Sequence, residues 1–212
     1  MVDIDTYILI GGRSRRLGRD KATVDLGGQT LAQRAFQTVT EALPDSRITF
    51  VAGNQAQFAI EAILADAGFI FDLVADRGPL GGLHSALADA TAPWIFVLAC
   101  DYPFMSSEMI RLLAENVSND YGAVVPEQPD GRLQPLCACY SVEKASLLVQ
   151  QIIDKPRVPP PLHEIVGELN PKIIEPVEFA HLSGSEDFFT NVNTAADLDL
   201  AGEIERKLSV EK

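Results

Sequence analysis

The sequence is short of the residues on which several large classes of protein depend. Only 17 lysines and arginines stand against 30 aspartates and glutamates, and the formal net charge of −13 argues against broad nucleic-acid binding. No apolar run is long enough to span a bilayer. The first residues, Met1–Asp5, are acidic and lead directly into an apolar run, which is unlike a signal peptide. We therefore expect a cytoplasmic protein that binds neither nucleic acid nor a membrane.

Cysteine is scarce as well. The three cysteines, Cys100, Cys137 and Cys139, lie in apolar, strand-like runs, and an odd number without a framework spacing favours reduced thiols. Strand alternation would place Cys137 and Cys139 on one face, as half of a metal site would need. Because the sequence has no second pair, we expect the thiols to be structural.

The first half of the chain alternates strand-like apolar runs with segments of helical periodicity. Strands are predicted at Thr6–Ile10, Arg47–Ala52, Phe69–Leu73 and Trp94–Cys100. Helices are predicted at Thr30–Glu41, at Gln57–Asp66, from Leu83 to about Thr91, and from a cap at Ser106 or Ser107 to about Glu115. This alternation predicts an α/β domain with a mostly parallel central sheet.

The second half is less regular. Its predicted strands are Ala123–Pro126, Pro135–Tyr140 and an edge strand at Ile173–Val177, with a turn at Gln128–Gly131. Its predicted helices are Val142–Ile153, His163–Glu168 and Ala195–Leu208, the last capped by Thr194. The proline-rich segment Lys155–Pro161 suits neither a helix nor a central strand, so we expect a rigid exposed connection. Without a repeat or a clear boundary, the 212 residues are read as a single domain.

Much of the positive charge is gathered in the loop after the first predicted strand. Gly11 and Gly12 open this loop, and five of the 17 basic residues follow within nine positions: Arg13, Arg15, Arg16, Arg19 and Lys21. Glycines allow the backbone to approach phosphate groups, and cationic side chains neutralise their charge. The spacing matches neither the dinucleotide-fold pattern nor the P-loop. The loop therefore predicts a polyphosphate site of another kind, against the plainer reading of a basic surface turn.

Two further loops follow predicted strands. Asp101 ends the most hydrophobic strand, where a carboxylate costs desolvation energy unless it is paired or binds a metal. Mg²⁺ prefers such oxygen ligands, although Asp101 could instead cap the turn before Pro103. The glycine-rich loop Asp76–Gly82 could hold a flat base or sugar, or form an ordinary turn. Because parallel strands place their carboxyl ends at one sheet edge, all three loops could meet there.

Asparagines mark two more positions. Asn191 and Asn193 alternate on a segment before the last predicted helix, so both side chains would point the same way, towards a phosphate or a metal. The simpler interpretation is a helix cap with turn-forming asparagines. Asn54 follows the second predicted strand, as a nucleotide contact or as a turn residue. The three histidines, His84, His163 and His181, have no partner arrangement and are expected to be structural or surface residues.

These motifs, taken in order, resemble a known family. The pattern L-x-G-G-x-S-x-R-x-G-x-D-K at Leu9–Lys21, the segment Asp76–Gly82, Ala99–Pro103 and Asn191–Thr194 are similar to the motifs of the molybdenum cofactor guanylyltransferases. The resemblance covers Tyr7 to about Leu198 and is weak between residues 115 and 185, where the proline run departs from the family pattern. It implies a Rossmann-like three-layer nucleotidyltransferase fold, with residues 1–115 binding the nucleotide and residues 116–212 the acceptor.

The resemblance also implies roles for single residues. Its catalytic residues would be Lys21, Arg16 and Asp101, with Asp101 as the Mg²⁺ ligand. The nucleotide-binding residues would be Leu9, Gly11, Gly12, Lys21, Asn54, Asp76, Gly82 and Asp101. Asn191 and Asn193 would face the acceptor.

The implied reaction joins GTP to molybdopterin. The terminal phosphate of molybdopterin would attack the α-phosphorus of GTP and release pyrophosphate, with molybdoenzyme maturation proteins as further partners. A phosphate monoester is already an anion at neutral pH, so alignment and charge neutralisation can suffice without a general base. Three alternatives stay open: cytidylyl transfer to molybdopterin, nucleotidyl transfer to a sugar phosphate or similar acceptor, and GTP binding without chemistry.

Overall fold

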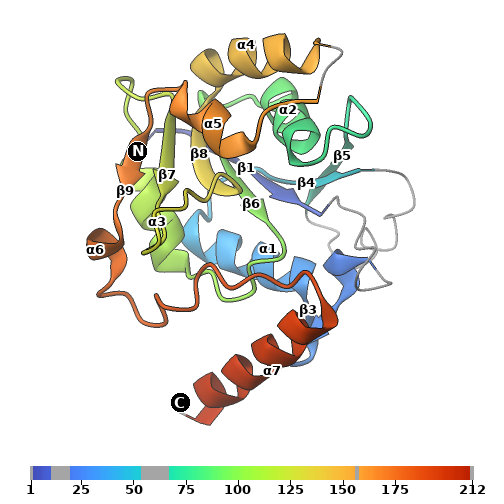
Figure 1. The fold of residues 1–212 in the computed structure, drawn as a ribbon, viewed down its shortest axis with the longest axis vertical. Coiled ribbons are helices and arrows are strands. Elements are labelled where there is room, and N and C mark those ends of the chain that lie inside the picture. Colours follow the sequence, from blue (N-terminus) through green and yellow to red (C-terminus); the bar gives the residue numbers. More distant parts are fainter. Residues whose placement is uncertain (1, 11–19, 54–66, 156–157, 211–212) are drawn as a thin grey trace.

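The computed structural model describes residues 2–10, 20–53, 67–155 and 158–210. Its main sheet has seven strands in the order β5-β4-β1-β6-β8-β7-β9 (Figure 1). The strands are β1 (Ile4–Leu9), β4 (Ile48–Ala52), β5 (Gly68–Phe71), β6 (Trp94–Ala99), β7 (Ala123–Pro126), β8 (Cys137–Ser141) and β9 (Lys172–Ile174). Within this sheet β8 runs antiparallel to both of its neighbours, and the remaining pairings are parallel. The mostly parallel α/β fold is confirmed.

Helices cover both faces of this sheet (Figure 1). One face packs on α1 (Leu31–Ala42) and α3 (Ser107–Glu115). The other packs on α2 (Pro79–Asp89), α4 (Val142–Ile153) and α5 (Leu162–Gly167). Side chains alternate along β1, so that Ile8 joins the first core while Tyr7 and Leu9 join the second. This alternation gives the three-layer arrangement expected for a sheet buried on both faces.

A small third core lies beside the sheet. The 3₁₀ turn Lys21–Thr23 leads into the hairpin of β2 (Asp25–Leu26) and β3 (Gln29–Thr30), and Gly27 and Gly28 form its turn with φ values of 66° and 87°. Val24, Leu26 and Leu31 pack here against Val192 and against Ala201 of the last helix, α7 (Ala195–Val210). Figure 1 shows α7 beside this hairpin, away from the sheet. The contact joins the start of the chain to its end.

Most predicted elements are found, with shifted boundaries. The strand expected at Phe69–Leu73 ends at Phe71, and the one expected at Pro135–Tyr140 begins at Cys137. The edge strand stops at Ile174 because Pro176 starts the short helix α6 (Pro176–Phe179). The helix expected at Gln57–Asp66 lies outside the described residues.

The largest correction concerns α2, which begins at Pro79 rather than at Leu83. Proline suits the first helical position because its φ is preset and its missing N–H would have no partner there. Gly78 precedes it with φ 56°, in the left-handed region that favours glycine. Residues 79–82, expected as loop, therefore form the first turn of a helix that points at the sheet edge.

The cysteines pack inside the protein. Cys100, Cys137 and Cys139 are buried free thiols in the same core, so Cys137 and Cys139 do share one face. Burial raises the pKa of all three thiols, which keeps them neutral. Among the described helices, none combines the length and apolar character needed to cross a bilayer.

Candidate active site

A cavity of about 350 Å³ opens at the carboxyl edge of the parallel strands. Six of the residues singled out in the sequence line it: Leu9, Lys21, Gly82, Asp101, Asn191 and Asn193. They come from β1, the 3₁₀ turn, α2, the end of β6 and the segment before α7. Ligands of open α/β sheets bind at this edge, where loops from several strands converge.

Lys21 and Asp101 form the charged centre of this cavity. The Lys21 ammonium lies 2.9 Å from Oδ2 of Asp101, and each side chain is 18% exposed. Lys21 also donates a hydrogen bond to Oδ1 of Asn193. The carboxylate is therefore paired, as its position after a buried strand requires. An ammonium, a carboxylate and an amide thus meet at the middle of the sheet edge.

The local fold explains why Asn191 and Asn193 both reach the cavity. The amide of Val192, between them, donates to the carbonyl of Asp101 at 3.0 Å, and its side chain is buried in the third core. Alternation then turns its neighbours towards the cavity. Oδ2 of Asp197 accepts from the amides of Asn193 (2.9 Å) and Thr194 (2.7 Å), which fixes this segment to the start of α7.

Asp72 is a cavity residue that the sequence reading missed. It follows β5 directly and lines the cavity with Val51 from the adjacent strand β4 and Leu9 from β1, the strand after that. Burial raises its pKa to about 6. The sequence feature that could have identified it is the same as for Asp101, namely an acidic residue at the end of an apolar strand. The apolar run to Leu73 predicts a strand that contains Asp72, and the sequence therefore does not single this residue out.

Asp76 occupies a different position. It is exposed, has φ 59°, and does not line the cavity. Within the predicted loop, the cavity is instead lined by Gly78, Pro79 and Gly82 at the start of α2. A Cβ at Gly82 would lie 3.2 Å from Cδ2 of Leu9, so glycine allows α2 to pack closely on β1.

The start of α2 adds a favourable field for an anion. A helix N-terminus carries unpaired amides and a partial positive charge. Here the helix has 11 residues, and its first turn opens onto the cavity. Together with Lys21, it offers positive potential in a chain whose net charge is −13.

The donor set at Asp101 fits a hard divalent cation. Carboxylate and amide oxygens are available from Asp101 and Asn193, side by side at Lys21. The described residues contain no group of three or more His, Cys, Asp or Glu side chains arranged to hold a metal. Mg²⁺ typically uses one or two carboxylates and completes its shell with water and ligand phosphates, so a single aspartate is an adequate anchor.

Several predicted site residues lie outside the described residues: Gly11, Gly12, Arg16 and Asn54. The histidines are described, and they are structural or surface residues as expected. His84 is buried between α2 and α4, with Nε2 2.7 Å from Oε1 of Gln150. His163 and His181 are exposed.

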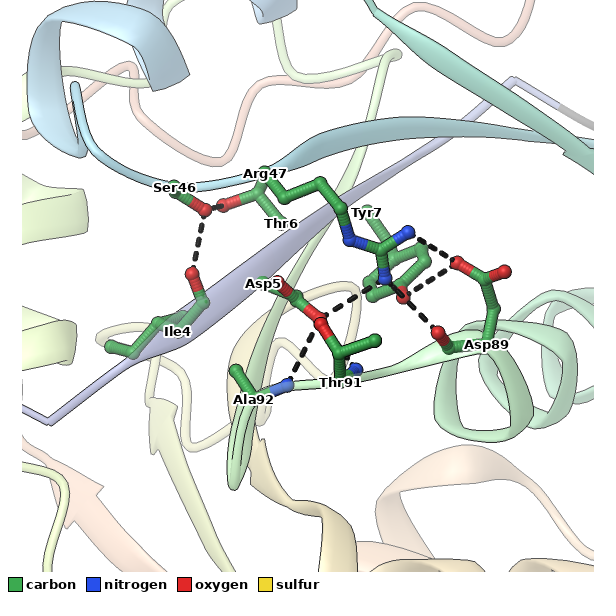
Figure 2. Close-up of polar contacts among 9 residues, drawn as sticks. All are labelled: Ile4, Asp5, Thr6, Tyr7, Ser46, Arg47, Asp89, Thr91 and Ala92. Carbon is green, nitrogen blue, oxygen red and sulfur yellow. Dashed lines mark hydrogen bonds and ion pairs between the residues drawn. The ribbon is translucent and has the colours of Figure 1, made fainter.

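A larger cavity of about 460 Å³ lies at the opposite edge of the sheet, but its polar groups serve the fold. Figure 2 shows Oδ2 of Asp5 accepting from Arg47 (3.0 Å), from the amide (2.7 Å) and hydroxyl (3.0 Å) of Thr91 and from the amide of Ala92 (3.1 Å). Arg47 also binds Asp89 at 2.9 Å. These groups bind one another across β1, β4 and the end of α2, so the candidate site is the cavity at Asp101.

Comparisons with known proteins agree with this geometry. A family model described as the MobA-like NTP transferase domain matches residues 6–155. A probable molybdenum cofactor guanylyltransferase of Pelotomaculum thermopropionicum is 32% identical over 93% of this chain and 91% of its own length.

Solved structures are similar over nearly the whole chain. Molybdopterin-guanine dinucleotide biosynthesis protein A of Archaeoglobus fulgidus superposes with a TM-score of 0.78 at 26% identity, covering 96% of this chain and 99% of that protein. A 4-diphosphocytidyl-2C-methyl-D-erythritol synthase of Anaerococcus prevotii gives a TM-score of 0.71 over 97% and 96% of the two chains. At 11% identity, that second likeness shows the fold alone.

Proposed function

The chain belongs to the MobA-like NTP transferase family and is a nucleotidyltransferase, and from this premise we propose that it transfers GMP from GTP to molybdopterin with release of pyrophosphate. The observation that carries the proposal is the meeting of Lys21, Asp101 and Asn193 in a cavity that extends along the sheet edge from the end of β5 to the start of β8. A charged centre with cavity space on both sides, towards Asp72 and towards Leu136, suits a reaction that joins two substrates through phosphate.

The nucleoside is placed at the β5–β4–β1 end of the cavity. There Val51 and Leu9 provide an apolar floor, and Asp72 provides a carboxylate that can accept from N–H or O–H groups of the base or sugar. Gly82 leaves room beside Leu9. Asp72 takes the part that the family resemblance suggested for Asp76, because Asp72 lines the cavity and Asp76 does not.

The triphosphate is placed between the start of α2 and Lys21. Arg16 and the backbone of Gly11 and Gly12, in the cationic loop, are proposed to complete its cradle. Asp101 would hold a Mg²⁺ ion, which supplies Lewis-acid polarisation of the phosphates when it is bound. Lys21, paired with Asp101 in the free protein, is positioned to offset charge on the departing pyrophosphate.

The chemical step needs alignment and not proton abstraction. An oxygen of the acceptor phosphate forms a bond to the α-phosphorus, while the bond from that phosphorus to the bridging oxygen breaks and its electron pair leaves with pyrophosphate. The attacking phosphate is an anion at neutral pH, so no general base is required. Stabilisation of the developing negative charge by Lys21 is the main contribution expected from this chain's own side chains, and Asp101 would hold the metal ion.

The proposal is tested by measuring pyrophosphate release with molybdopterin and each of GTP, CTP, ATP and UTP, with and without Mg²⁺. Release that requires GTP, Mg²⁺ and molybdopterin is the expected result. Preference for CTP would indicate cytidylyl transfer, and release only with another phosphate acceptor would indicate a different transferase of the same fold. Binding of GTP without turnover against any acceptor would indicate a non-catalytic GTP-binding protein and overturn the proposal.

A further inference from the structure

A second cavity, of about 360 Å³, lies next to the one at Asp101. The two cavities share three lining residues, Pro79, Tyr102 and Leu136, so they adjoin each other. The far wall of the second cavity is a proline segment, Pro159–Leu162, which we call the proline wall. This is the segment in which the sequence departs from the family pattern, and Pro159 and Pro160 are half-buried rather than exposed as predicted.

The order of the strands indicates which substrate lies at each end of the two adjoining cavities. Passing along the sheet edge, one meets Asp72 after β5, Leu9 on β1, Asp101 after β6 and Leu136 before β8. Because β8 is antiparallel to β6, the residue before its first residue lies at the same edge as the residues after β6. With the nucleoside at Asp72 and the reacting phosphates at Asp101, the acceptor must extend beyond Asp101, towards Leu136. The second cavity begins there.

The second cavity is preformed. A terminal nitrogen of Arg77 donates to the carbonyls of Ile153 (3.0 Å) and Lys155 (3.1 Å), which ties the loop before α2 to the end of α4. The carbonyl of Pro161 accepts from the amide of Glu164 at 3.1 Å, so the proline wall is continuous with α5. Proline fixes φ, and little conformational entropy is lost when a ligand binds against such a wall.

The lining favours a flat ring system. Tyr102 is buried, its hydroxyl donates to Oε1 of Gln134 at 2.8 Å, and its ring meets Phe189 edge to face at a centroid distance of 6.5 Å. Its ring is therefore held in place and its polar atom is already bonded. Prolines and leucines form most of the remaining lining. Rigid apolar faces of this kind suit stacking of a planar heterocycle whose polar edge stays in water.

We propose that this second cavity is the subsite for the ring end of the acceptor, a planar fused heterocycle of the pterin class, whose phosphate lies at Lys21 and Asp101. The inference rests on the proposed function, which it extends by naming where the acceptor's ring binds. The proposed function places the guanine base at Asp72, on the other side of Asp101 in the strand order, which leaves this subsite to the acceptor.

The test uses 6-hydroxymethylpterin phosphate, a fluorescent pterin with a phosphate monoester, added to protein saturated with Mg²⁺ and a GTP analogue whose α,β-bridge is methylene. Pro160→Arg places a long charged side chain in the subsite. Val158→Arg is the matched control, because Val158 is 90% exposed, lies two residues away and does not line the cavity. Leu162→Arg, at the first residue of α5, provides a second block of the same cavity. Thermal unfolding confirms that each variant is folded.

We expect Pro160→Arg and Leu162→Arg to weaken pterin phosphate binding by about tenfold or more, since loss of one apolar wall costs at least that much. Val158→Arg is expected to bind as the wild type does, and GTP affinity is expected to stay within about twofold in all three. Unchanged pterin phosphate binding in both blocked variants overturns the subsite. Loss of GTP affinity in those variants also overturns it, because the nucleotide would then occupy the cavity.

Two further outcomes separate this inference from the proposed function. A wild-type protein that binds GTP but no pterin phosphate overturns the subsite and leaves nucleotide binding standing. A wild-type protein that binds pterin phosphate in a manner sensitive to Pro160→Arg, but binds no GTP, keeps the subsite and overturns the guanylyl transfer.

Discussion

The ammonium nitrogen of Lys21 lies 2.9 Å from Oδ2 of Asp101, although 80 positions separate the two residues in the chain. Each comes from a rigid support: Lys21 opens a 3₁₀ turn capped by Asp20, and Asp101 follows the fully buried strand β6. The hydrogen bond from Val192 to Asp101 brings a third segment to the same place. The charged centre is thus assembled from both ends and the middle of the chain before any substrate is bound.

The first prediction concerns Lys21. Lys21→Met removes the cation that we propose lies beside the departing pyrophosphate, and loss of one electrostatic stabiliser should lower kcat by about 100-fold or more. Lys144→Met, on the exposed surface of α4, is the matched control and should keep wild-type kcat. The measurement is steady-state pyrophosphate release with GTP and acceptor. Near-normal kcat in Lys21→Met would show that Lys21 serves only to pair Asp101.

The second prediction separates Asp72 from Asp76. Asp72→Asn should weaken GTP binding about tenfold, the usual scale for losing one charged hydrogen-bond acceptor. Asp76→Asn, four residues further along the chain, should change it less than about twofold, because Asp76 does not line the cavity. Isothermal titration of both variants with GTP and Mg²⁺ decides between the two residues. If Asp76→Asn weakened GTP binding more than Asp72→Asn does, Asp76 would be the residue that contacts the nucleotide, as the motif suggested.

Asp72 also predicts a pH dependence. Its pKa is raised by burial to about 6, so the carboxylate is progressively protonated as the pH falls through that value. GTP binding by the wild type should therefore weaken between pH 7 and pH 5 more steeply than binding by Asp72→Asn, which has no group to titrate. The comparison cancels the titration of the triphosphate itself. Parallel curves for the two proteins would show that Asp72 does not contact GTP.

The raised pKa of Asp72 also affects the stability of the fold. Its effect on the pH dependence of stability is opposite to that of a carboxylate whose pKa is lowered by folding. A folded pKa above the unfolded value of about 3.9 means that the charged form is disfavoured in the folded protein, so stability is lost as the pH rises through 6. Because Asp72 is partly solvent-exposed, we expect Asp72→Asn to gain only about 1 kcal/mol at pH 8. The gain should vanish at pH 4. Urea unfolding at the two pH values measures it.

Asp101 and Asp72 show how far the sequence could predict the site. A carboxylate after a buried strand is a strong signal, because it must be paired or bound, and this found Asp101. Asp72 also follows an apolar strand, but strand ends can be predicted only to within a few residues. The predicted strand continues to Leu73 and so includes Asp72, although the strand in the structure ends at Phe71. The alternation of Asn191 and Asn193 was predictable from the two-residue period of extended chain. That this segment meets Lys21 could not be predicted from the sequence, since the contact depends on tertiary packing around Val192.

The helix α2 and the proline wall show what local patterns could not provide. Gly78 and Pro79 are turn residues by propensity, yet they start a helix because proline is well suited to the first helical position. The proline wall was expected to be exposed because proline excludes it from helix and sheet. Its packing towards Tyr102 follows from the placement of α4 and α5, which is a property of the whole fold.

A further prediction tests how α7 positions the site. Asp197 accepts from the amides of Asn193 and Thr194, and this hydrogen bonding lowers its pKa. Asp197→Ala should cost about 1 kcal/mol of stability as a lost helix cap and should lower kcat several-fold, because Asn193 is no longer held against Lys21. Asp199→Ala, on an exposed position of the same helix, should do neither. A fall in stability without a fall in kcat would limit Asp197 to capping α7.

Another prediction concerns the network at the opposite edge of the sheet (Figure 2). Asp5 is 7% exposed in its side chain and Arg47 is 41% exposed. Arg47→Met would leave the Asp5 carboxylate buried with the amides of Thr91 and Ala92 as partners but without a countercharge. A fully buried ion pair broken in this way costs about 3–5 kcal/mol, and the exposure of Arg47 reduces the expected loss to about 2 kcal/mol. Since the network lies far from Asp101, kcat of the folded variant should stay normal.

The pH dependence of this network follows from the direction of the Asp5 shift. Burial alone raises the pKa of Asp5, but the hydrogen bonds from Arg47, Thr91 and Ala92 outweigh it and leave the pKa below its usual value. A lowered folded pKa gives stability that is present above the unfolded pKa of about 3.9 and is lost as the pH falls through the folded value. The difference in unfolding free energy between wild type and Asp5→Asn should therefore be constant from pH 5 to pH 8 and shrink below about pH 4. A difference that does not change with acidification would mean that the network stabilises the fold through its hydrogen bonds alone, without a contribution from the charge of Asp5.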